Sequence, residues 1–185
     1  NTAGMLQSQA EATGEESSAQ ITNRVQVSTV TGLSGTDSDN LVSGEIDRLK
    51  LTVLRSPGAN DIDLTNVVIE VFANGESGTL THIGSQSTND FDGTAITAPG
   101  TGTIGAGSEK FAILNIQNAK DGSLSDTSDR AQLIFDLSDI ASASSQATLA
   151  TGNTVAISVT TAAGGTAFVE KRAPSTIDKG KTYRL

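Results

Sequence analysis

The chain has 185 residues, enough for one sizeable hydrophobic core, so we expect one domain or a domain with an appendage. Its 21 acidic residues outnumber its 12 basic residues and give a net charge of −9. Nucleic acids and anionic membranes are bound through clustered Lys and Arg, so this charge argues against both partners. The chain has no cysteine, which excludes disulfides and thiol chemistry.

The acidic composition also suits a medium of high salt. At 1 M salt the Debye length falls to about 3 Å, and repulsion between like charges is screened. We therefore interpret the host as halophilic. The alternative is an ordinary secreted protein that its acidic surface keeps soluble.

The first predicted element is a helix over residues 2–22, which lack proline and include the helix formers Gln, Glu, Ala, Met and Leu. Small and apolar residues recur every three or four positions and so share one helical face. These residues are Leu6, Ala10, Thr13, Ser17 and Ile21. Only two of them are large, so we expect the isolated helix to fray unless it packs against another surface.

Two interpretations of this helix differ in what it packs against. A short amphipathic helix could fold back as a lid on a β-domain, but a lid normally carries more large apolar residues. Small residues such as Ala10 and Ser17 instead let identical helices approach closely. The candidates for contact between copies are Met5, Leu6, Ala10, Thr13, Ser17 and Ile21.

After Arg24 the hydrophobic period changes to that of strands. A first strand is predicted around Val25, Val27 and Thr29, followed by a loop over residues 32–40. Further strands are predicted at residues 46–54, 67–73, 78–83, 110–117, 131–137, 154–161 and 167–172, with a short closing strand at 181–185. Residues 85–108 have little to bury and are predicted as an extended loop or hairpin on the outer surface.

These short strands and polar turns predict a mainly β protein, an antiparallel β-sandwich or barrel of the Ig-like kind with an N-terminal α-helix. We expect residues 1–24 to form the helical part and residues 25–185 the β-domain.

Catalytic chemistry has little support in this sequence. His82 is the chain's one histidine and lies in a predicted strand, where histidines usually pack or face solvent. No nucleophile elbow accompanies it, and the glycine-rich residues 100–107 lack the strand–helix unit of a dinucleotide loop. Sugar hydrolysis needs an aromatic-lined cleft, and the chain has five Phe and one Tyr. We expect neither enzymatic activity nor a cofactor.

A structural cation is a weaker hypothesis. Hard cations bind several oxygen ligands from flexible loops, and residues 36–40 and 60–63 supply such oxygens. The EF-hand spacing fails, and most aspartate-rich turns only cap backbone N–H groups. The weak candidates for metal ligands are Asp37, Asp39, Asn40, Asp61 and Asp63.

Two segments of the chain resemble the archaeal flagellins, or archaellins. The more specific is residues 1–27, which contain NTAG, LQ, EATG-x-E-S and the entry N-R-V-Q-V into the first strand. The C-terminal sequence KRAPSTIDKGKTYRL, with its proline-containing link and short final strand, is also similar to the family. In archaellins a strongly apolar stretch precedes the first segment, so we expect this chain to be the soluble part of a longer polypeptide.

The resemblance implies a type IV pilin-like subunit of an extracellular swimming filament, the archaellum. Residues 1–24 would then be the C-terminal part of the filament-core helix, and residues 25–185 the outer β-domain with lateral contacts. The implied partners are other copies of the chain and other archaellins, with membrane contact only before assembly, through the preceding apolar segment. N-linked glycans are common in the family, but the chain has no Asn-x-Ser/Thr sequence.

The sequence alone is also compatible with two other functions. A secreted β-sandwich binding module would keep its activity without residues 1–22, whereas a filament subunit would fold but not assemble. A subunit of a non-motile adhesive type IV-like pilus would share the polymer chemistry, and the motility of a deletion strain would distinguish it.

Overall fold

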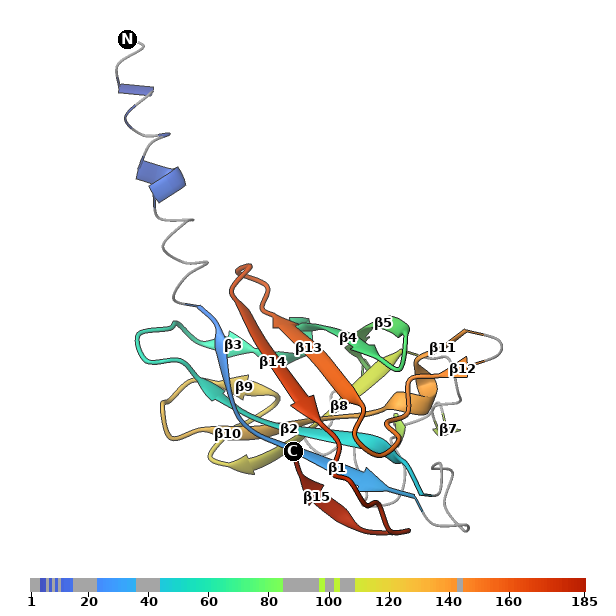
Figure 1. Cartoon of the computed structure of the whole chain (residues 1–185). Coiled ribbons are helices and arrows are strands. Elements are labelled where there is room, and N and C mark those ends of the chain that lie inside the picture. Colours follow the sequence, from blue (N-terminus) through green and yellow to red (C-terminus); the bar gives the residue numbers. More distant parts are fainter. Residues whose placement is uncertain are drawn as a thin grey trace.

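The computed structural model describes residues 4–5, 7, 9, 11–14, 23–35, 44–84, 97–98, 102–103, 109–142 and 145–185. Figure 1 shows the helical residues of the N-terminal segment lying away from a β-body that carries the C-terminus. The described residues between positions 4 and 14 are helical, in agreement with the predicted helix.

The β-body is built on one nine-stranded sheet of order β14-β13-β4-β5-β8-β10-β2-β1-β15. Its strands are β1 (Val25–Ser34), β2 (Ile46–Arg55), β4 (Val68–Ala73), β5 (Glu76–His82), β8 (Lys110–Gln117), β10 (Arg130–Asp136), β13 (Thr154–Thr160), β14 (Thr166–Arg172) and β15 (Thr182–Arg184). The sheet curls so that β14 and β13 cross over the layer that contains β2, β10 and β8 (Figure 1). This mainly β, sandwich-like architecture confirms the predicted fold class.

Six shorter strands pair outside the main sheet. These are β3 (Ile62–Asp63) with β9 (Ser123–Leu124), β6 (Thr97–Ala98) with β7 (Gly102–Thr103), and β11 (Ala141–Ser142) with β12 (Ser145–Gln146). Two 3₁₀ helices, η1 (Leu64–Asn66) and η2 (Leu137–Asp139), complete the described elements. The β6–β7 pair lies inside the segment predicted as a loop or hairpin.

The first strand is longer than predicted. β1 continues through Gly32 to Ser34, so the predicted loop over residues 32–40 is wrong for its first three residues. Two neighbouring strands hold this extension, because Leu33 pairs with Arg48 on β2 and with Thr182 on β15. A Cβ at position 32 would lie 2.6 Å from Ile46 Cγ2, so glycine here permits a close approach of side chain to backbone.

The β4–β5 connection is a tight hairpin. Asn74 and Gly75 have φ values of 52° and 80°, as a two-residue turn of type I′ requires. The turn starts β5 at Glu76, two residues before the predicted start.

One pair of neighbouring strands in the main sheet is parallel. β5 meets β8 through only Thr81↔Lys110 and His82↔Phe111, whereas the other pairs in this sheet are antiparallel. Parallel neighbours need a crossover connection, and here residues 83–109 supply it. The pattern of alternating residues did not reveal this direction.

Side chains from both layers form one main hydrophobic core. Its largest members, all fully buried, include Phe111, Phe135, Leu49, Ile69, Leu80 and Leu133. Burial of each such side chain contributes roughly 1.5–3 kcal/mol. A second cluster, Ala112 and Ile134 with Ile83 and Leu114, packs apart from this core.

Candidate functional site

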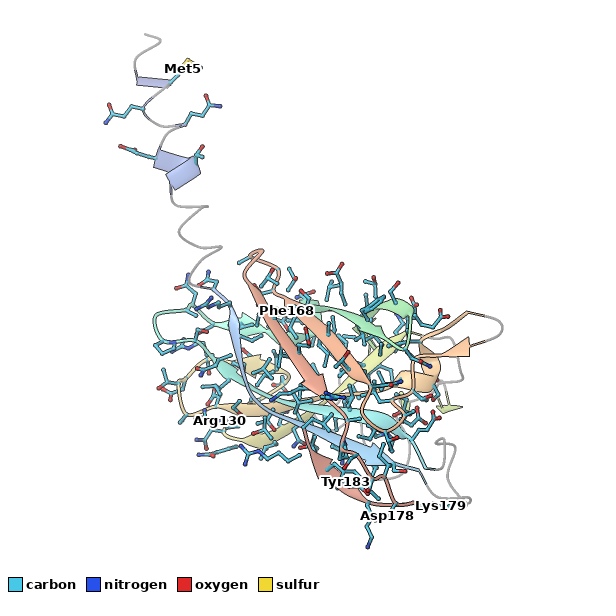
Figure 2. The ribbon with its side chains drawn as sticks, viewed as in Figure 1. Met5, Arg130, Phe168, Asp178, Lys179 and Tyr183 are labelled. Carbon is cyan, nitrogen blue, oxygen red and sulfur yellow. The ribbon has the colours of Figure 1, made fainter. Side chains whose placement is uncertain are left out.

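The described residues of the N-terminal helix are all exposed, so none of them shares in the core of the β-body. Met5 is 76% exposed and projects from the helix far from the β-body (Figure 2). The hydrogen bonds seen here are local: Gln7 Nε2 donates to Glu11 Oε1 at 3.3 Å, and Thr13 Oγ1 donates to the Gln9 carbonyl at 2.8 Å. Local bonds of this kind do not replace the packing that a marginal helix needs.

The helical interface therefore stays a prediction. Met5 and Thr13 lie exposed on the helix, available for contact with another molecule. Leu6, Ala10, Ser17 and Ile21 fall outside the described residues. A helix with the length and hydrophobicity to span a bilayer does not occur among the residues that the structure describes.

The outer surface of β14, β13, β4 and β5 carries two exposed aromatic rings. Phe72 on β4 is 57% exposed, and Phe168 on β14 is 68% exposed. Strand β13 separates them, with Ala156 opposite Phe72 and Ser158 opposite Phe168. Because these two residues are small, the surface between the rings is hollowed into a groove of about 400 Å³. We call this surface the Phe face: Phe168, Glu170, Ala156, Ser158, Glu70, Phe72, Ser77 and Thr79.

The outer surface of β2, β10 and β8 carries a different set of side chains. Ile116 is 51% exposed, and Arg130, Gln132 and Leu54 lie at neighbouring outward positions. Arg130 Nη1 donates to the carbonyls of Thr127 at 2.9 Å and of Asp129 at 2.8 Å. We call this surface the Ile116 face: Lys50, Thr52, Leu54, Arg130, Gln132, Leu114 and Ile116. Ala112 and Ile134 have the same phase on β8 and β10, but they are fully buried in the second cluster and are not part of this face.

Buried charges lie where β2 and β10 approach η2. Arg48, 2% exposed, donates from Nε and Nη2 to the two carboxylate oxygens of Asp136 at 2.5 and 2.8 Å. Asp47 accepts hydrogen bonds from the N–H and the hydroxyl of Ser138 at 2.8 and 3.2 Å. Burial, and then the charges of Asp136 and Asp47, raise the pKa of Asp139 to about 7, against the opposing effect of Arg48. This cluster is enclosed by the body, so we assign it to folding rather than to ligand binding.

Lys50 belongs to the same end of β2. Burial, and then the neighbouring charge of Arg48, lower the pKa of its ammonium group.

Two of the candidate cation ligands have protein partners. Asp63 caps η1, since its carboxylate accepts from the Thr65 N–H at 2.9 Å, the Thr65 hydroxyl at 2.6 Å and Asn66 Nδ2 at 2.7 Å. Asp61 lies 3.2 Å from Arg55 Nη1. The Asp63 contacts are those of a capping residue, whereas Asp61 forms an ion pair.

The other candidate ligands, Asp37, Asp39 and Asn40, fall outside the described residues. In the part of the chain that is described, no group of three or more His, Cys, Asp or Glu side chains is arranged to hold a metal ion. Cation binding through the predicted residues stays a prediction.

The side chain of His82 packs against its neighbours in the β-body. Its Nδ1 accepts a hydrogen bond from the Gly84 N–H at 3.3 Å, and its ring centroid lies 5.6 Å from that of Phe111. These contacts fit the structural role expected for a histidine in a strand.

Sequence reasoning missed the two outer faces and the turn before β10. The signal in the sequence was the position of these residues. Large apolar side chains stand at Phe72, Phe168 and Ile116, where the alternation of each strand calls for a residue that faces solvent. In the turn, the nearly buried Asp129 accepts hydrogen bonds from the Ser125 and Asp126 N–H groups at 2.8 and 2.9 Å.

An exposed helix joined to a self-contained β-body is the form expected of a polymerising subunit. The family model for archaeal-type flagellin matches residues 1–183. The chain belongs to the archaeal-type flagellin family. Flagellin A2 of Halobacterium salinarum is 31% identical to it over 185 residues, which cover 100% of this chain and 81% of that protein. Flagellin A1 of Haloferax volcanii is 30% identical over 173 residues, 91% of this chain and 75% of its own length.

Solved structures of archaeal flagellins share this fold. The crystal structure of archaeal flagellin FlaB1 from Methanocaldococcus jannaschii matches with a TM-score of 0.64 at 19% identity, over 87% of this chain and 95% of that one. The archaeal flagellum of Methanospirillum hungatei strain JF1 matches with a TM-score of 0.57 at 13% identity, over 97% of this chain and 83% of that one.

The family confirms the function inferred from the two resembling segments. This archaeal-type flagellin is a structural subunit of the extracellular archaellum filament. Its haloarchaeal relatives agree with the halophilic host inferred from the charge of −9. The family is one of filament subunits, so the chain's exposed surfaces are candidates for contacts between subunits rather than for catalysis.

Proposed function

We propose that this archaeal-type flagellin polymerises through its N-terminal helix, and that its β-body forms the outer layer of the filament. In this proposal residues 1–24 belong to the filament core and residues 25–185 form the outer domain. The observation that supports it is the contrast in burial: the β-body has a core of its own, whereas every described residue of the helix is exposed.

A helix of about 22 residues extends roughly 33 Å, long enough to join a central helical bundle to an outer shell. It gains stability by packing, and the small residues at positions 10, 13 and 17 would permit close contact between identical helices. Each contact can be weak, because a filament repeats it along its whole length. We propose other copies of this chain, and related archaellins, as the partners.

An apolar segment before residue 1, implied by the family resemblance, would extend the same helix. Before assembly it would hold the subunit in the membrane, and in the filament it would pack in the interior.

Deletion of residues 1–22 from the full-length subunit tests the proposal. We expect the truncated protein to keep the β-type circular dichroism and the thermal midpoint of the β-body, and to form no filaments by negative-stain electron microscopy. The matched control is the single substitution Ser28→Ala on β1, which should leave assembly intact. Filaments of normal diameter built from the truncated protein would overturn the proposal.

The ionic strength of the medium gives a second test. Because the net charge is −9, neighbouring subunits repel one another when salt no longer screens them. We expect filaments to loosen on dialysis into low salt. Unchanged length and diameter by electron microscopy would contradict this expectation.

A further inference from the structure

The Phe face is unusual for a chain with few aromatic residues. The chain has five phenylalanines and no tryptophan. Phe111 and Phe135 are completely buried, yet Phe72 and Phe168 are more than half exposed on one surface. Exposed aromatic side chains that gather on one surface are typical of protein–protein contact sites, where they act as anchors.

The Phe face also has a defined shape and charge. Across three neighbouring strands, Phe168 lies in register with Ser158 and Glu70, and Phe72 with Ala156 and Glu170. The small residues leave the groove between the rings open to a side chain from outside. Glu70 and Glu109 line the groove, and no Lys or Arg is among the residues that line it. Arg172 has the same phase as Glu170 on β14, but it lies outside the groove and donates a hydrogen bond to the Gly152 carbonyl.

The Ile116 face carries basic side chains where the Phe face carries acidic ones. Its seven residues include three large apolar residues that are at least partly exposed and two basic residues, and none of the seven is a carboxylate. Asp136 has the same phase farther along β10 and is paired with Arg48. Ile116 is the most exposed of the apolar residues, and Arg130 lies beside it on the next strand. The backbone carbonyls that hold Arg130 carry no net charge, so its positive charge is available to an acidic surface.

The two faces lie on separate layers of the β-body, and the main core lies between these layers. Figure 2 shows Phe168 on one layer and Arg130 on the other. One copy can therefore present its Phe face to one neighbour and its Ile116 face to a second neighbour. A contact between two different faces does not close on itself, and it generates open helical assemblies.

We propose that the Phe face of one copy docks on the Ile116 face of the next copy in the filament. Ile116 enters the groove between the two phenylalanines, and Arg130 meets the glutamates beside them. The occupant is a second copy of this chain because the two surfaces match in charge and in apolar character. The proposal rests on the proposed function, since it assigns residues to the lateral contact between β-bodies.

Disulfide trapping tests the contact directly, because the chain contains no cysteine. The double variant Phe168→Cys/Ile116→Cys is introduced into the full-length subunit, and assembled filaments are oxidised. If the two faces meet, non-reducing electrophoresis shows a ladder of dimers, trimers and higher multimers. The single variants Phe168→Cys and Ile116→Cys should stay monomeric on the gel.

Three outcomes would overturn the proposal while the filaments still form. Absence of a ladder from intact double-variant filaments means that the faces do not meet. Dimers from Phe168→Cys alone mean that the Phe face pairs with itself. An equal ladder from the control Phe168→Cys/Lys179→Cys, which moves the second thiol to another exposed site, means that cross-linking is nonspecific. Failure of the unsubstituted subunit to form filaments would instead refute the proposed function.

Charge reversal provides a second measurement in the same filaments. Arg130→Glu places a negative charge opposite Glu70, so we expect shorter or fewer filaments at a given salt concentration. The double variant Glu70→Arg/Arg130→Glu restores opposite charges across the contact, and assembly should recover. Circular dichroism of each variant checks that the β-body is folded. Folded double variants that assemble no better than Arg130→Glu alone would contradict the charge pairing.

Discussion

The N-terminal helix and the β-body bury their apolar residues in different ways. In the body, Phe135, Leu133 and Leu49 are fully enclosed by side chains of the same molecule. In the helix, the described residues are exposed, and the large side chain of Met5 contacts solvent. The body is therefore complete as a monomer, whereas the helix needs neighbours for its stability. Substitutions in the core of the body should therefore affect folding, whereas substitutions on the helix should affect assembly.

The largest effect on folding should come from the centre of the body. Phe135→Ala removes a fully buried ring, and we expect the free energy of unfolding to fall by about 3–5 kcal/mol, as for other large-to-small core changes. Urea denaturation followed by circular dichroism measures this loss. Phe168→Ala makes the same chemical change at an exposed ring and should cost less than about 1 kcal/mol. Equal losses in the two variants would contradict the assigned burial.

The next effect concerns Asp139, whose raised pKa of about 7 makes folding depend on pH. The folded protein holds this proton up to about pH 7, whereas the unfolded chain releases it near the ordinary value of 3.8. The free energy of unfolding should therefore fall as pH rises from about 4 to 7, by about 1.4 kcal/mol per unit at most, and then level off.

Asp139→Asn mimics the protonated form, so it should abolish this fall and be the more stable protein at pH 8. Thermal melts between pH 4 and 8 give the comparison. The helix supplies the control, because Glu11→Gln changes an exposed carboxyl and should leave the pH profile unchanged. A wild-type profile that rises between pH 4 and 7, in parallel with that of Asp139→Asn, would count against the burial of this carboxyl.

A smaller effect is expected at the cap of η1. Asp63→Ala removes the carboxylate that accepts hydrogen bonds from Thr65 and Asn66, and loss of such a cap costs about 1 kcal/mol. Chemical denaturation measures the change, with and without EDTA. If Asp63 only caps the helix, the loss is the same in both conditions. A loss seen only without EDTA would show that a bound cation depends on this residue.

The smallest effect on folding should come from the helix. Met5→Ala changes a side chain that is 76% exposed, so the thermal midpoint of the body should shift by less than about 1 °C, an effect below roughly 0.5 kcal/mol. If Met5 packs between copies, the same variant assembles less readily, which light scattering of the full-length subunit detects. Normal assembly would remove Met5 from the proposed interface.

Much of the body could be predicted from the sequence, because its long strands bury alternate residues against a core. The period-2 pattern located β8 at its observed bounds and β13 within one residue. Two-residue strands such as β3 and β9 carry no such pattern, since tertiary neighbours create them. The parallel direction of β5 and β8 was also hidden, because strand direction follows from the path of the chain and not from alternation.

The candidate site was less predictable. The helix was inferred from small residues at regular spacing, but which of them touch a second molecule depends on a partner that no single sequence describes. Phe72, Phe168 and Ile116 look like ordinary strand residues until the register shows that they point outward. Asp63 was considered as a cation ligand because an aspartate-rich turn and a capping turn have the same composition.

The position of β1 in the sheet determines how the protein withstands tension. β1 is the first strand after the N-terminal helical residues, so a pull on the N-terminal segment reaches the body through this strand. β1 pairs with β2 along its length. The C-terminal part of β1 also pairs with β15, through Thr31, Gly32 and Leu33. A force along the strand axis loads these perpendicular hydrogen bonds in shear, all together rather than one after another. The pairing of the C-terminal strand β15 thus helps β1 to stay in the sheet under force, in a filament that transmits torque.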